Sequence, residues 1–275
     1  MGYSRQYYYK KCKENSEKTA KERYVKQLVE QKRKILPRVG TRKLYHLIKD
    51  QLKQAQIKFG RDHLFDLLRQ NDLLIKPGRR YVVTTMSKHW MRKWPNLIRE
   101  AVIERPDQVW VSDITYIKTE QGYCYLNMIT DFYSRKIVGY AVDDNMEAQS
   151  MIRALEMANK TRINRNEHTI HHSDRGIQYC SKEYVSFCQK NDIRLSMTEN
   201  SDPYENALAE RMNRTMKEEF GLGGKLKSKQ QVQHLIEESV TLYNQLRPHL
   251  ALNMLTPDKV YKNEKSRSLE AIGII

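Results

Sequence analysis

The stretch DQVWVSDITYI, residues 107–117, decides the fold. Its valine, tryptophan and isoleucine content is typical of a β-strand. Because side chains alternate along a strand, Val109, Val111 and Asp113 are expected on one face. An isolated carboxylate at the centre of an apolar strand is costly to bury, so Asp113 must be paired or hold a cation. The stretch therefore predicts a strand that carries a chemically constrained aspartate.

The segments that follow this strand predict its surroundings. After the turn signal Gln121–Gly122, YCYLNMITD makes a second strand and IVGYAVDD a third. The later elements are expected as a helix over 147–160, the strand HTIHH (168–172), a helix capped by Ser181, the strand RLSM (194–197), a helix over 206–220, and a last helix that opens at Ser228 with a capping-box pattern. Three antiparallel strands followed by alternating elements predict an α/β fold: a ribonuclease H-like mixed sheet flanked by helices, with the first strand through its middle.

Three acidic residues on separate elements of this sheet could meet at one edge. Asp113 sits mid-strand, Asp174 directly follows the fourth strand, and Glu210 lies in the first half of the helix that starts near Asn206. Three carboxylates suit Mg²⁺ or Mn²⁺. Two such ions ~4 Å apart can activate an attacking oxygen and stabilise the leaving oxygen of a phosphodiester. Taken singly, Asp174 could cap a turn and Glu210 could be a surface residue, so the prediction rests on all three.

The segment HHSDRGIQY, residues 171–179, contains two histidines that raise the question of zinc. His171 and His172 alternate in direction at a strand end, so we expect them to pack or to form hydrogen bonds. A zinc site would need further ligands, and Cys180 and Cys188 form no recognised spacing with them. We therefore expect no zinc, and Arg175–Gly176 should shape the turn that presents Asp174.

The net charge of +16 is confined to one part of the chain. Residues 1–105 hold 27 Lys and Arg against 10 Asp and Glu, whereas residues 106–275 hold 22 against 23. A basic arm joined to a neutral body indicates a polyanion-binding module attached to a second function. A solvated helical surface rich in lysine is the alternative, but the size of the excess favours nucleic acid.

The basic arm is predicted to be helical. A polar helix is expected over 8–35, and two amphipathic segments around Gly60 are compatible with a helix-turn-helix. We expect five parts: a basic helix (1–37), a helix-turn-helix-like DNA-binding region (38–75), a basic linker (76–105), an α/β core (106–262) and a tail (263–275). The candidate DNA contacts in the arm are Arg42, Lys43, Arg61, Lys76, Arg79 and Arg80.

Other features of the chain argue against a membrane or an oxidising compartment. No apolar run approaches the ~20 residues that a membrane-spanning helix needs, and the N-terminus lacks the apolar region of a secretory signal. Four widely spaced cysteines without a C-x-x-C pair favour reduced thiols in a cytoplasmic protein. We therefore expect no membrane partner.

The spacing of the acids, together with their sequence context, resembles a known family. Asp113 lies 61 residues before Asp174, and 35 residues separate Asp174 from Glu210. The three stand within W-V-S-D-I-T-Y, H-S-D-R-G-x-Q-Y and N-A-L-A-E-R-M-N-R-T-M-K-E-E, and YNQLRPHLALNMLTPDKVY follows near the C-terminus. This pattern resembles the integrase-like DDE transposases of bacterial insertion sequences, above all the catalytic second-frame protein of the IS-three (insertion sequence three) family, a relative of retroviral integrases. The resemblance covers about residues 38–262.

The resemblance implies an activity and a set of partners. Such a protein nicks DNA at element ends with water, and the freed 3′-OH attacks another phosphodiester. Asp113 would contact two metal ions (Mg²⁺ or Mn²⁺), and Asp174 and Glu210 would each hold one. Basic residues on the helix of Glu210 would hold the DNA terminus, here Arg214 and Lys217; an exposed Glu210–Arg214 ion pair is the alternative. Expected partners are double-stranded DNA with terminal inverted repeats, target DNA and further copies of the chain, in a bacterial, nucleoid-associated setting.

Two departures from the pattern qualify these expectations. Retroviral integrases carry an N-terminal His/His/Cys/Cys zinc module, whereas only Cys12 accompanies the three histidines before residue 100. The family usually joins an upstream helix-turn-helix protein to the catalytic half by frameshifting, so recognition of the terminal repeats could reside partly in such a partner. Two other functions stay open: a ribonuclease H-type nuclease without strand transfer, and a catalytically silent DNA-binding regulator.

Overall fold

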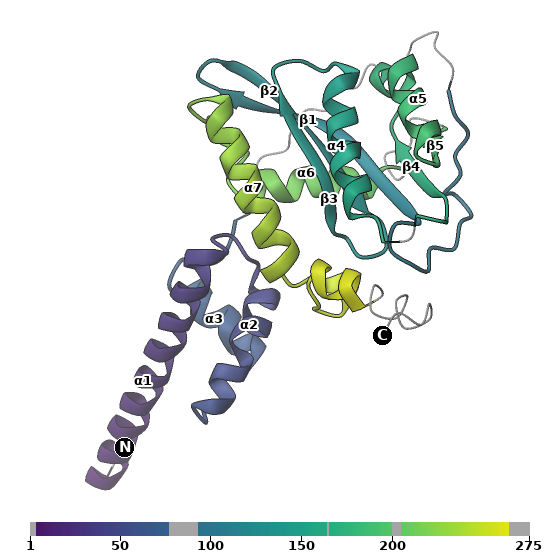
Figure 1. The fold of residues 1–275 in the computed structure, drawn as a ribbon. Coiled ribbons are helices and arrows are strands. Elements are labelled where there is room, and N and C mark those ends of the chain that lie inside the picture. Colours follow the sequence, from purple (N-terminus) through teal and green to yellow (C-terminus); the bar gives the residue numbers. More distant parts are fainter. Residues whose placement is uncertain (1–3, 77–92, 164, 200–204, 264–275) are drawn as a thin grey trace. The chain divides into compact units, whose positions relative to one another are not determined.

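The computed structural model describes residues 4–76, 93–163, 165–199 and 205–263, and its chain divides into two compact units, Met1–Pro77 and Gly78–Ile275 (Figure 1). Each unit has buried apolar residues of its own. The division of the chain into five parts that the sequence suggests, with boundaries at residues 37, 75, 105 and 262, stays a prediction. None of the described helices combines the length and apolar character needed to cross a bilayer.

The first unit contains three helices, α1 (Arg5–Ile35), α2 (Thr41–Gln54) and α3 (Arg61–Gln70). The hydroxyl of Ser4 caps α1 by accepting a hydrogen bond from the amide of Tyr7 at 3.2 Å. The apolar positions of α2 and α3 are buried, as their helical spacing predicts, although Leu47 is only half-buried. The buried residues of α1 lie in its C-terminal half, at Val25, Leu28 and Val29.

The second unit is built on a five-stranded mixed sheet in the order β3-β2-β1-β4-β5 (Figure 1). β1 pairs antiparallel with β2 and parallel with β4, so it runs through the middle of the sheet as predicted. The strands are β1 (Val109–Thr119), β2 (Gly122–Asp131), β3 (Ile137–Asp143), β4 (Thr169–Ser173) and β5 (Ile193–Met197). The ribonuclease H-like mixed sheet expected from the sequence is confirmed.

Helices cover the two faces of the sheet. The helical elements are α4 (Ala148–Thr161), η1 (Ile177–Cys180, a 3₁₀ turn), α5 (Lys182–Lys190), α6 (Ala207–Glu219), α7 (Lys229–Leu246) and η2 (Leu250–Leu252, a 3₁₀ turn). Trp110 packs in one cluster with residues of α4 and α5, whereas its neighbours Val109 and Val111 pack with Ala209 of α6 on the opposite face. The alternation along β1 is therefore the one that the sequence predicts.

The sequence also predicts two of the helix caps. Ser181 accepts a hydrogen bond from the amide of Tyr184 at 3.2 Å at the start of α5. Ser228 accepts one from the amide of Gln231 at 3.3 Å at the start of α7, while the Gln231 side chain accepts from the amide of Lys227 at 2.6 Å. This reciprocal pair is a capping box whose glutamine reaches one residue further back than usual.

The C-terminal YNQLRPHLALNMLTPDKVY segment is tied into the core by two buried side chains. Arg247 is 3% exposed and donates two hydrogen bonds to Glu219 of α6, at 2.8 and 2.6 Å. The hydroxyl of Tyr261 donates to the buried carboxylate of Asp107 at 2.8 Å. The arginine and the final tyrosine of this segment therefore fasten it to the end of α6 and to the turn before β1.

Candidate active site

Asp113 lies at the centre of β1, where its half-buried carboxylate is held from two sides. Its Oδ1 accepts a hydrogen bond from the amide of Ile114 at 2.9 Å, and its Oδ2 accepts one from Nδ2 of Asn213 in α6 at 2.8 Å. Two donors of this kind fix the direction of the carboxylate. They leave it facing α6, the side on which Val109 and Val111 also lie.

Asp174 follows β4 directly and lies close enough to Asp113 for its negative charge to raise the pKa of that carboxyl group. Val111 of β1 is paired with His172 of β4, an offset of 61 residues, and the same offset separates Asp113 from Asp174. The paired part of β1 and β4 ends at Val111 and His172, two residues before the two acids. The Asp174 carboxylate accepts a hydrogen bond from the amide of Gly176 at 3.0 Å, so its own turn holds it.

Gly176 leaves little space around that turn. A Cβ at this position would lie 3.1 Å from Oδ1 of Asp174 and 3.0 Å from the side-chain oxygen of Gln178. The neighbouring Arg175 donates from Nε to the carbonyl of Thr198 at 2.6 Å, which anchors the turn to the segment after β5. Arg175 and Gly176 thus shape the turn that carries Asp174, as the sequence suggests.

Glu210 lies in the first turn of α6 and is exposed. Asn213 follows it by three residues and shares its side of the helix. Because Asn213 donates to Asp113, this side of α6 faces β1. The structure therefore brings the element of Glu210 against the strand of Asp113, next to the turn of Asp174.

Nearby negative charges raise the pKa values of Asp113 and Glu210. Burial, and next the negative charge of Asp174, raise the pKa of Asp113 to about 7, although the hydrogen bonds from Asn213 and Ile114 lower it. Burial and the charge of Asp174 also raise the pKa of Glu210. A nearby negative charge raises the pKa of a carboxyl group in this way when no cation balances it.

Three carboxylates from three elements are a donor set that suits a hard divalent cation. However, across the four described ranges no group of three His, Cys, Asp or Glu side chains is gathered so that it could hold a metal ion. Asp113, Asp174 and Glu210 are neighbours whose charges interact, and they do not form a closed set of ligands in this arrangement.

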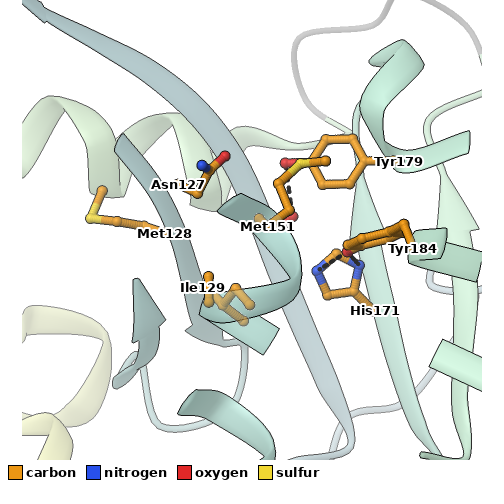
Figure 2. A pocket seen from close by; sticks show the side chains of 9 residues that line it. Asn127, Met128, Ile129, Met151, His171, Tyr179 and Tyr184 are labelled. Atoms are coloured by element: carbon orange, nitrogen blue, oxygen red, sulfur yellow. Dashed lines mark hydrogen bonds between the residues drawn. The ribbon is translucent and has the colours of Figure 1, made fainter. Parts of the chain in front are cut away.

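The two histidines before Asp174 are buried and hydrogen-bonded on opposite faces of β4. Rings from η1 and α5 surround His171 (Figure 2), and the Tyr184 hydroxyl lies 3.1 Å from its Nδ1. His172 is bonded through Nδ1 to the hydroxyl of Ser196 at 2.8 Å and through Nε2 to the carbonyl of Glu205 at 3.0 Å. Burial lowers the pKa of His171 to about 3 and that of His172 to about 4, so both rings are neutral. Packing and hydrogen bonding, which the sequence predicts for both, are confirmed.

The basic residues predicted on α6 differ in their surroundings. Nζ of the half-buried Lys217 lies 4.7 Å from the centre of the Tyr116 ring. Burial lowers the pKa of Lys217, and the negative charge of Asp113 acts in the opposite direction, which places this ammonium in the field of the acidic site. Arg214 is exposed and forms its ion pair with Glu218 at 2.9 Å, not with Glu210.

The predicted DNA contacts of the first unit are mostly at its surface. Arg42, Arg61 and Lys76 are exposed and Lys43 is half-buried. Arg61 is hydrogen-bonded to the neighbouring Asp62 at 2.8 Å. Arg79 and Arg80 lie outside the described residues.

Three residues that support the site are not predicted from the sequence. Asn213 holds Asp113, Asn206 donates to the carbonyl of Ser112 at 3.1 Å, and the Tyr179 hydroxyl accepts from the hydroxyl of Ser112 at 3.1 Å. Asn213 could have been found from its position three residues after Glu210. Nothing in the sequence pairs Asn206 or Tyr179 with Ser112, because these contacts depend on how α6 and η1 pack on β1.

Comparison with known proteins agrees with this architecture. Residues 103–203 match a family described as the integrase core domain, and residues 191–257 match a second family of the same description. The chain is 33% identical over 220 residues to the insertion element IS600 uncharacterized 31 kDa protein of Shigella sonnei, a match that covers 79% of each chain. It is 29% identical over 212 residues to the transposase InsF for insertion sequence IS3A of Escherichia coli K12, over 76% of this chain and 73% of that one.

A solved structure shows the same fold. A chain of the simian T-cell lymphotropic virus intasome in complex with PP2A regulatory subunit B56 gamma superposes with a TM-score of 0.50 at 17% identity, covering 81% of this chain and 74% of that chain. Because the sequence match to the IS600 protein spans most of both chains and the core has the integrase architecture, the chain belongs to the IS3 family of DDE transposases, which carry out DNA transposition with an integrase core domain.

Proposed function

We propose that this chain nicks DNA at the terminal inverted repeats of its own insertion element and joins the freed 3′-OH to a phosphodiester of target DNA. Asp113, Asp174 and Glu210 are the proposed catalytic residues. One observation carries the assignment of these residues. Asn213, three residues after Glu210 on α6, donates to Asp113 at 2.8 Å, and the negative charge of Asp174 raises the pKa of Asp113, which supports a site shared by the three acids. Three elements thereby present carboxylates to one region.

Integrases and DDE transposases generally use divalent metal ions, and we propose Mg²⁺ or Mn²⁺, two ions, for this chain. Asp113, Asp174 and Glu210 would hold them, since negative charge nearby raises the pKa of Asp113 and of Glu210 and a cation would relieve that repulsion. When bound, such ions activate the attacking oxygen and stabilise the leaving oxygen. Glu210 is the exposed member of the three, so its side chain is the one free to turn inward.

The protein's own groups would position both the acids and the DNA. Asn213 holds the Asp113 carboxylate in one orientation. Lys217 brings a positive charge next to the acidic residues, where it would neutralise a phosphate, and Arg214 on the exposed side of α6 would do the same for a neighbouring one. These contacts would hold a strand in line with the carboxylates.

The basic first unit would supply further contacts to the element ends. Arg42, Lys43, Arg61 and Lys76, with Arg79 and Arg80, are the proposed phosphate-binding residues. We propose that several copies of the chain assemble on paired DNA ends, as integrases and transposases act on DNA and oligomerise. An upstream helix-turn-helix partner protein, and a cytoplasmic, nucleoid-associated location, complete the proposal.

The experiment incubates the full chain with Mg²⁺ and labelled DNA that ends in the inverted repeats bordering its coding region. Nicked and joined products are expected from the wild type and not from Asp113→Asn, Asp174→Asn or Glu210→Gln. Glu183→Gln is the matched control, because Glu183 is likewise an acid in the first turn of a helix, α5, but lies outside the site. Joining that survives Asp113→Asn would contradict the assignment.

Two other outcomes identify the rival functions. Products with free 3′-OH ends that are never joined to target DNA would indicate a ribonuclease H-type nuclease. Tight binding of one duplex without any cleavage that depends on Mg²⁺ would indicate a silent DNA-binding regulator. Both would overturn strand transfer, and only the second would also overturn catalysis.

A further inference from the structure

The tip of the β1–β2 hairpin bears tyrosines and lysines on a single face, close to the acidic site. Tyr116 is paired across the strands with Tyr125, and Lys118 with Tyr123. Residues opposite each other in an antiparallel pair, and residues two apart on one strand, share a face. The rings of Tyr116 and Tyr123 contact edge to face, with centres 5.7 Å apart. Tyr123 is 53% exposed.

Lysines from the connection between α6 and α7 lie beside this tip. Leu226 forms a parallel bridge with Thr119, its amide donates to the carbonyl of Lys118 at 3.0 Å, and its carbonyl accepts from the amide of Glu120 at 2.9 Å. Figure 1 shows this connection running alongside the hairpin. The exposed Lys225 and Lys227 flank Leu226, so the hairpin tip and the connection form one basic surface.

The positive charge of this surface is not balanced locally by ion pairs. Throughout the described part of the chain, no carboxylate forms a salt bridge with Lys118, Lys225 or Lys227. Lys217 links the surface to the site, because its ammonium lies over the Tyr116 ring and within the field of Asp113. Tyr116 lies three residues after Asp113 on β1, so the two side chains leave the strand on opposite faces, and the contact of Lys217 with the Tyr116 ring is what joins the surface to the site.

We propose that this hairpin surface, defined by Tyr116, Tyr123, Lys118, Lys217, Lys225 and Lys227, binds an unpaired stretch of the DNA strand next to the phosphodiester at the acidic site. The proposal rests on the proposed function. Exposed aromatic rings set among lysines suit single-stranded DNA, since bases stack on the rings while the lysines follow the phosphates. Tyr123, the most exposed of the rings, stacks on a base, and Lys118, opposite it, neutralises a phosphate.

The position of the surface explains why it would meet a single strand. Pairing with β4 is made by the first three residues of β1, Val109, Trp110 and Val111, whereas pairing with β2 extends to Thr119. Among the described residues, β1 has no strand partner on the β4 side between Val111 and Thr119, so a DNA strand whose phosphodiester lies at Asp113 would pass this open edge, where Lys217 contacts Tyr116, to reach the hairpin surface. Charge complementarity selects DNA as the occupant over a second copy of this chain, because like-charged surfaces repel.

The test measures DNA binding by the full chain without divalent cations, so that nothing is cut. Fluorescence anisotropy gives the Kd for a labelled duplex with a single-stranded thymidine overhang and for the same duplex with blunt ends. Tyr123→Ala should weaken binding of the overhang duplex roughly 5- to 150-fold, the loss expected for one stacked base. The blunt duplex should lose much less. Tyr123→Phe keeps a ring and should bind as the wild type does.

The lysines of the hairpin surface should contribute to DNA binding by neutralising phosphates. Lys118→Gln should weaken binding of overhang DNA and reduce the slope of log Kd against log salt by about one. Lys190→Gln is the matched control, an exposed lysine on α5 that should change neither quantity. Melting temperatures equal to that of the wild type establish that the variants are folded, which is expected because Tyr123 and Lys118 are exposed.

Two results would overturn the proposal while leaving the proposed function intact. One is an unchanged Kd of Tyr123→Ala for overhang DNA from a chain that still nicks and joins DNA. The other is a change in the sedimentation of Tyr123→Ala without DNA, which would identify the surface as a contact between copies. Failure of the wild type to nick or join would instead count against the proposed function itself.

Discussion

At the scale of single residues, the acidic site depends on side chains that are not themselves acids. Asn213 directs the Asp113 carboxylate and lowers its pKa, whereas burial and Asp174 raise it. The balance leaves a carboxyl group that titrates near neutrality in the absence of a cation. Both the orientation and the charge of Asp113 therefore respond to changes around it.

Substitution of Asn213 tests its positioning role. Asn213→Ala should slow joining about tenfold, because a hydrogen bond to a charged group is worth ~1.5–3 kcal/mol and Asp113 would lose its fixed orientation. The Mg²⁺ concentration for half-maximal rate should rise as well, a change that a purely structural role would not cause. The free energy of unfolding should fall as well, because Asn213 is buried and its hydrogen bond to Asp113 is lost, so the Mg²⁺ dependence is the measurement that identifies the positioning role. A joining rate and Mg²⁺ dependence equal to the wild type would contradict the role.

Substitution of Asp113 should change the pH dependence of stability. The pKa of Asp113 is about 7 when folded, above its ordinary value of 3.8, so the folded metal-free protein binds this proton more tightly than the unfolded chain. The stabilisation that this proton contributes to the folded protein is complete below the pKa of the aspartate in the unfolded chain, and it is lost as the pH rises through about 7. Metal-free Asp113→Asn should therefore be more stable than the wild type by about 2 kcal/mol at about pH 8, with the gap closing toward about pH 4.

Thermal unfolding at the two pH values measures this difference. Added Mg²⁺ should raise the melting temperature of the wild type and not that of Asp113→Asn, because the variant lacks the central ligand. Equal free energies of unfolding for the wild type and Asp113→Asn at both pH values would mean that burial of the Asp113 carboxylate does not destabilise the fold.

At the scale of elements, the ends of α6 and α7 are joined by a buried ion pair. Arg247 donates two hydrogen bonds to Glu219 and lies 5.3 Å from the centre of the Tyr243 ring. Arg247→Ala should lower the free energy of unfolding by about 3–5 kcal/mol, because it removes the buried charge that donates two hydrogen bonds to a largely buried glutamate. Arg214→Ala provides the control, since its ion pair with Glu218 is exposed and should be worth under about 1 kcal/mol. Chemical denaturation compares the two, and losses of similar size would contradict the structural role of Arg247.

A second element-scale prediction concerns the contact of α4 with β3. A Cβ at Gly139 would lie 2.1 Å from the carbonyl oxygen of Ala154 in α4, so Gly139→Ala must push the helix away from the sheet. The expected loss is several kcal/mol, since overpacking typically costs ~1–3 kcal/mol and here the obstacle is backbone. Gly60→Ala, where a Cβ would meet no atom within 4 Å, is the control. Equal melting temperatures for the two variants would contradict this packing.

Local sequence signals predict most of the helices and strands, whereas contacts between distant segments are not predicted. The five strands, their order of types and the main helices follow from apolar periodicity and turn residues, which are local signals. The close approach at Gly139, the 3₁₀ turn η1 and the Arg247–Glu219 pair depend on contacts between distant segments. For the same reason the three acids could be named from their sequence context, and Asn213 from its position on the helix of Glu210, whereas the contacts of Asn206 and Tyr179 with Ser112 could not.

At the scale of the whole molecule, the basic excess lies in the first 105 residues and the acidic site in a nearly neutral remainder. Binding of DNA should therefore fall steeply with salt. Combined Arg42→Gln and Arg61→Gln should reduce the slope of log Kd against log salt by about two, one for each phosphate contact. Anisotropy titrations at several salt concentrations measure the slope. A slope equal to the wild type would show that the first unit makes no phosphate contact through these arginines.

If Asp113, Asp174 and Glu210 hold divalent cations together, Mn²⁺ should bind to this chain and depend on Asp113. Electron paramagnetic resonance counts the Mn²⁺ bound to the full chain in the presence of its DNA ends. We expect about two ions for the wild type and for Glu183→Gln, and a loss of binding in Asp113→Asn. Undiminished Mn²⁺ binding by Asp113→Asn would contradict this expectation.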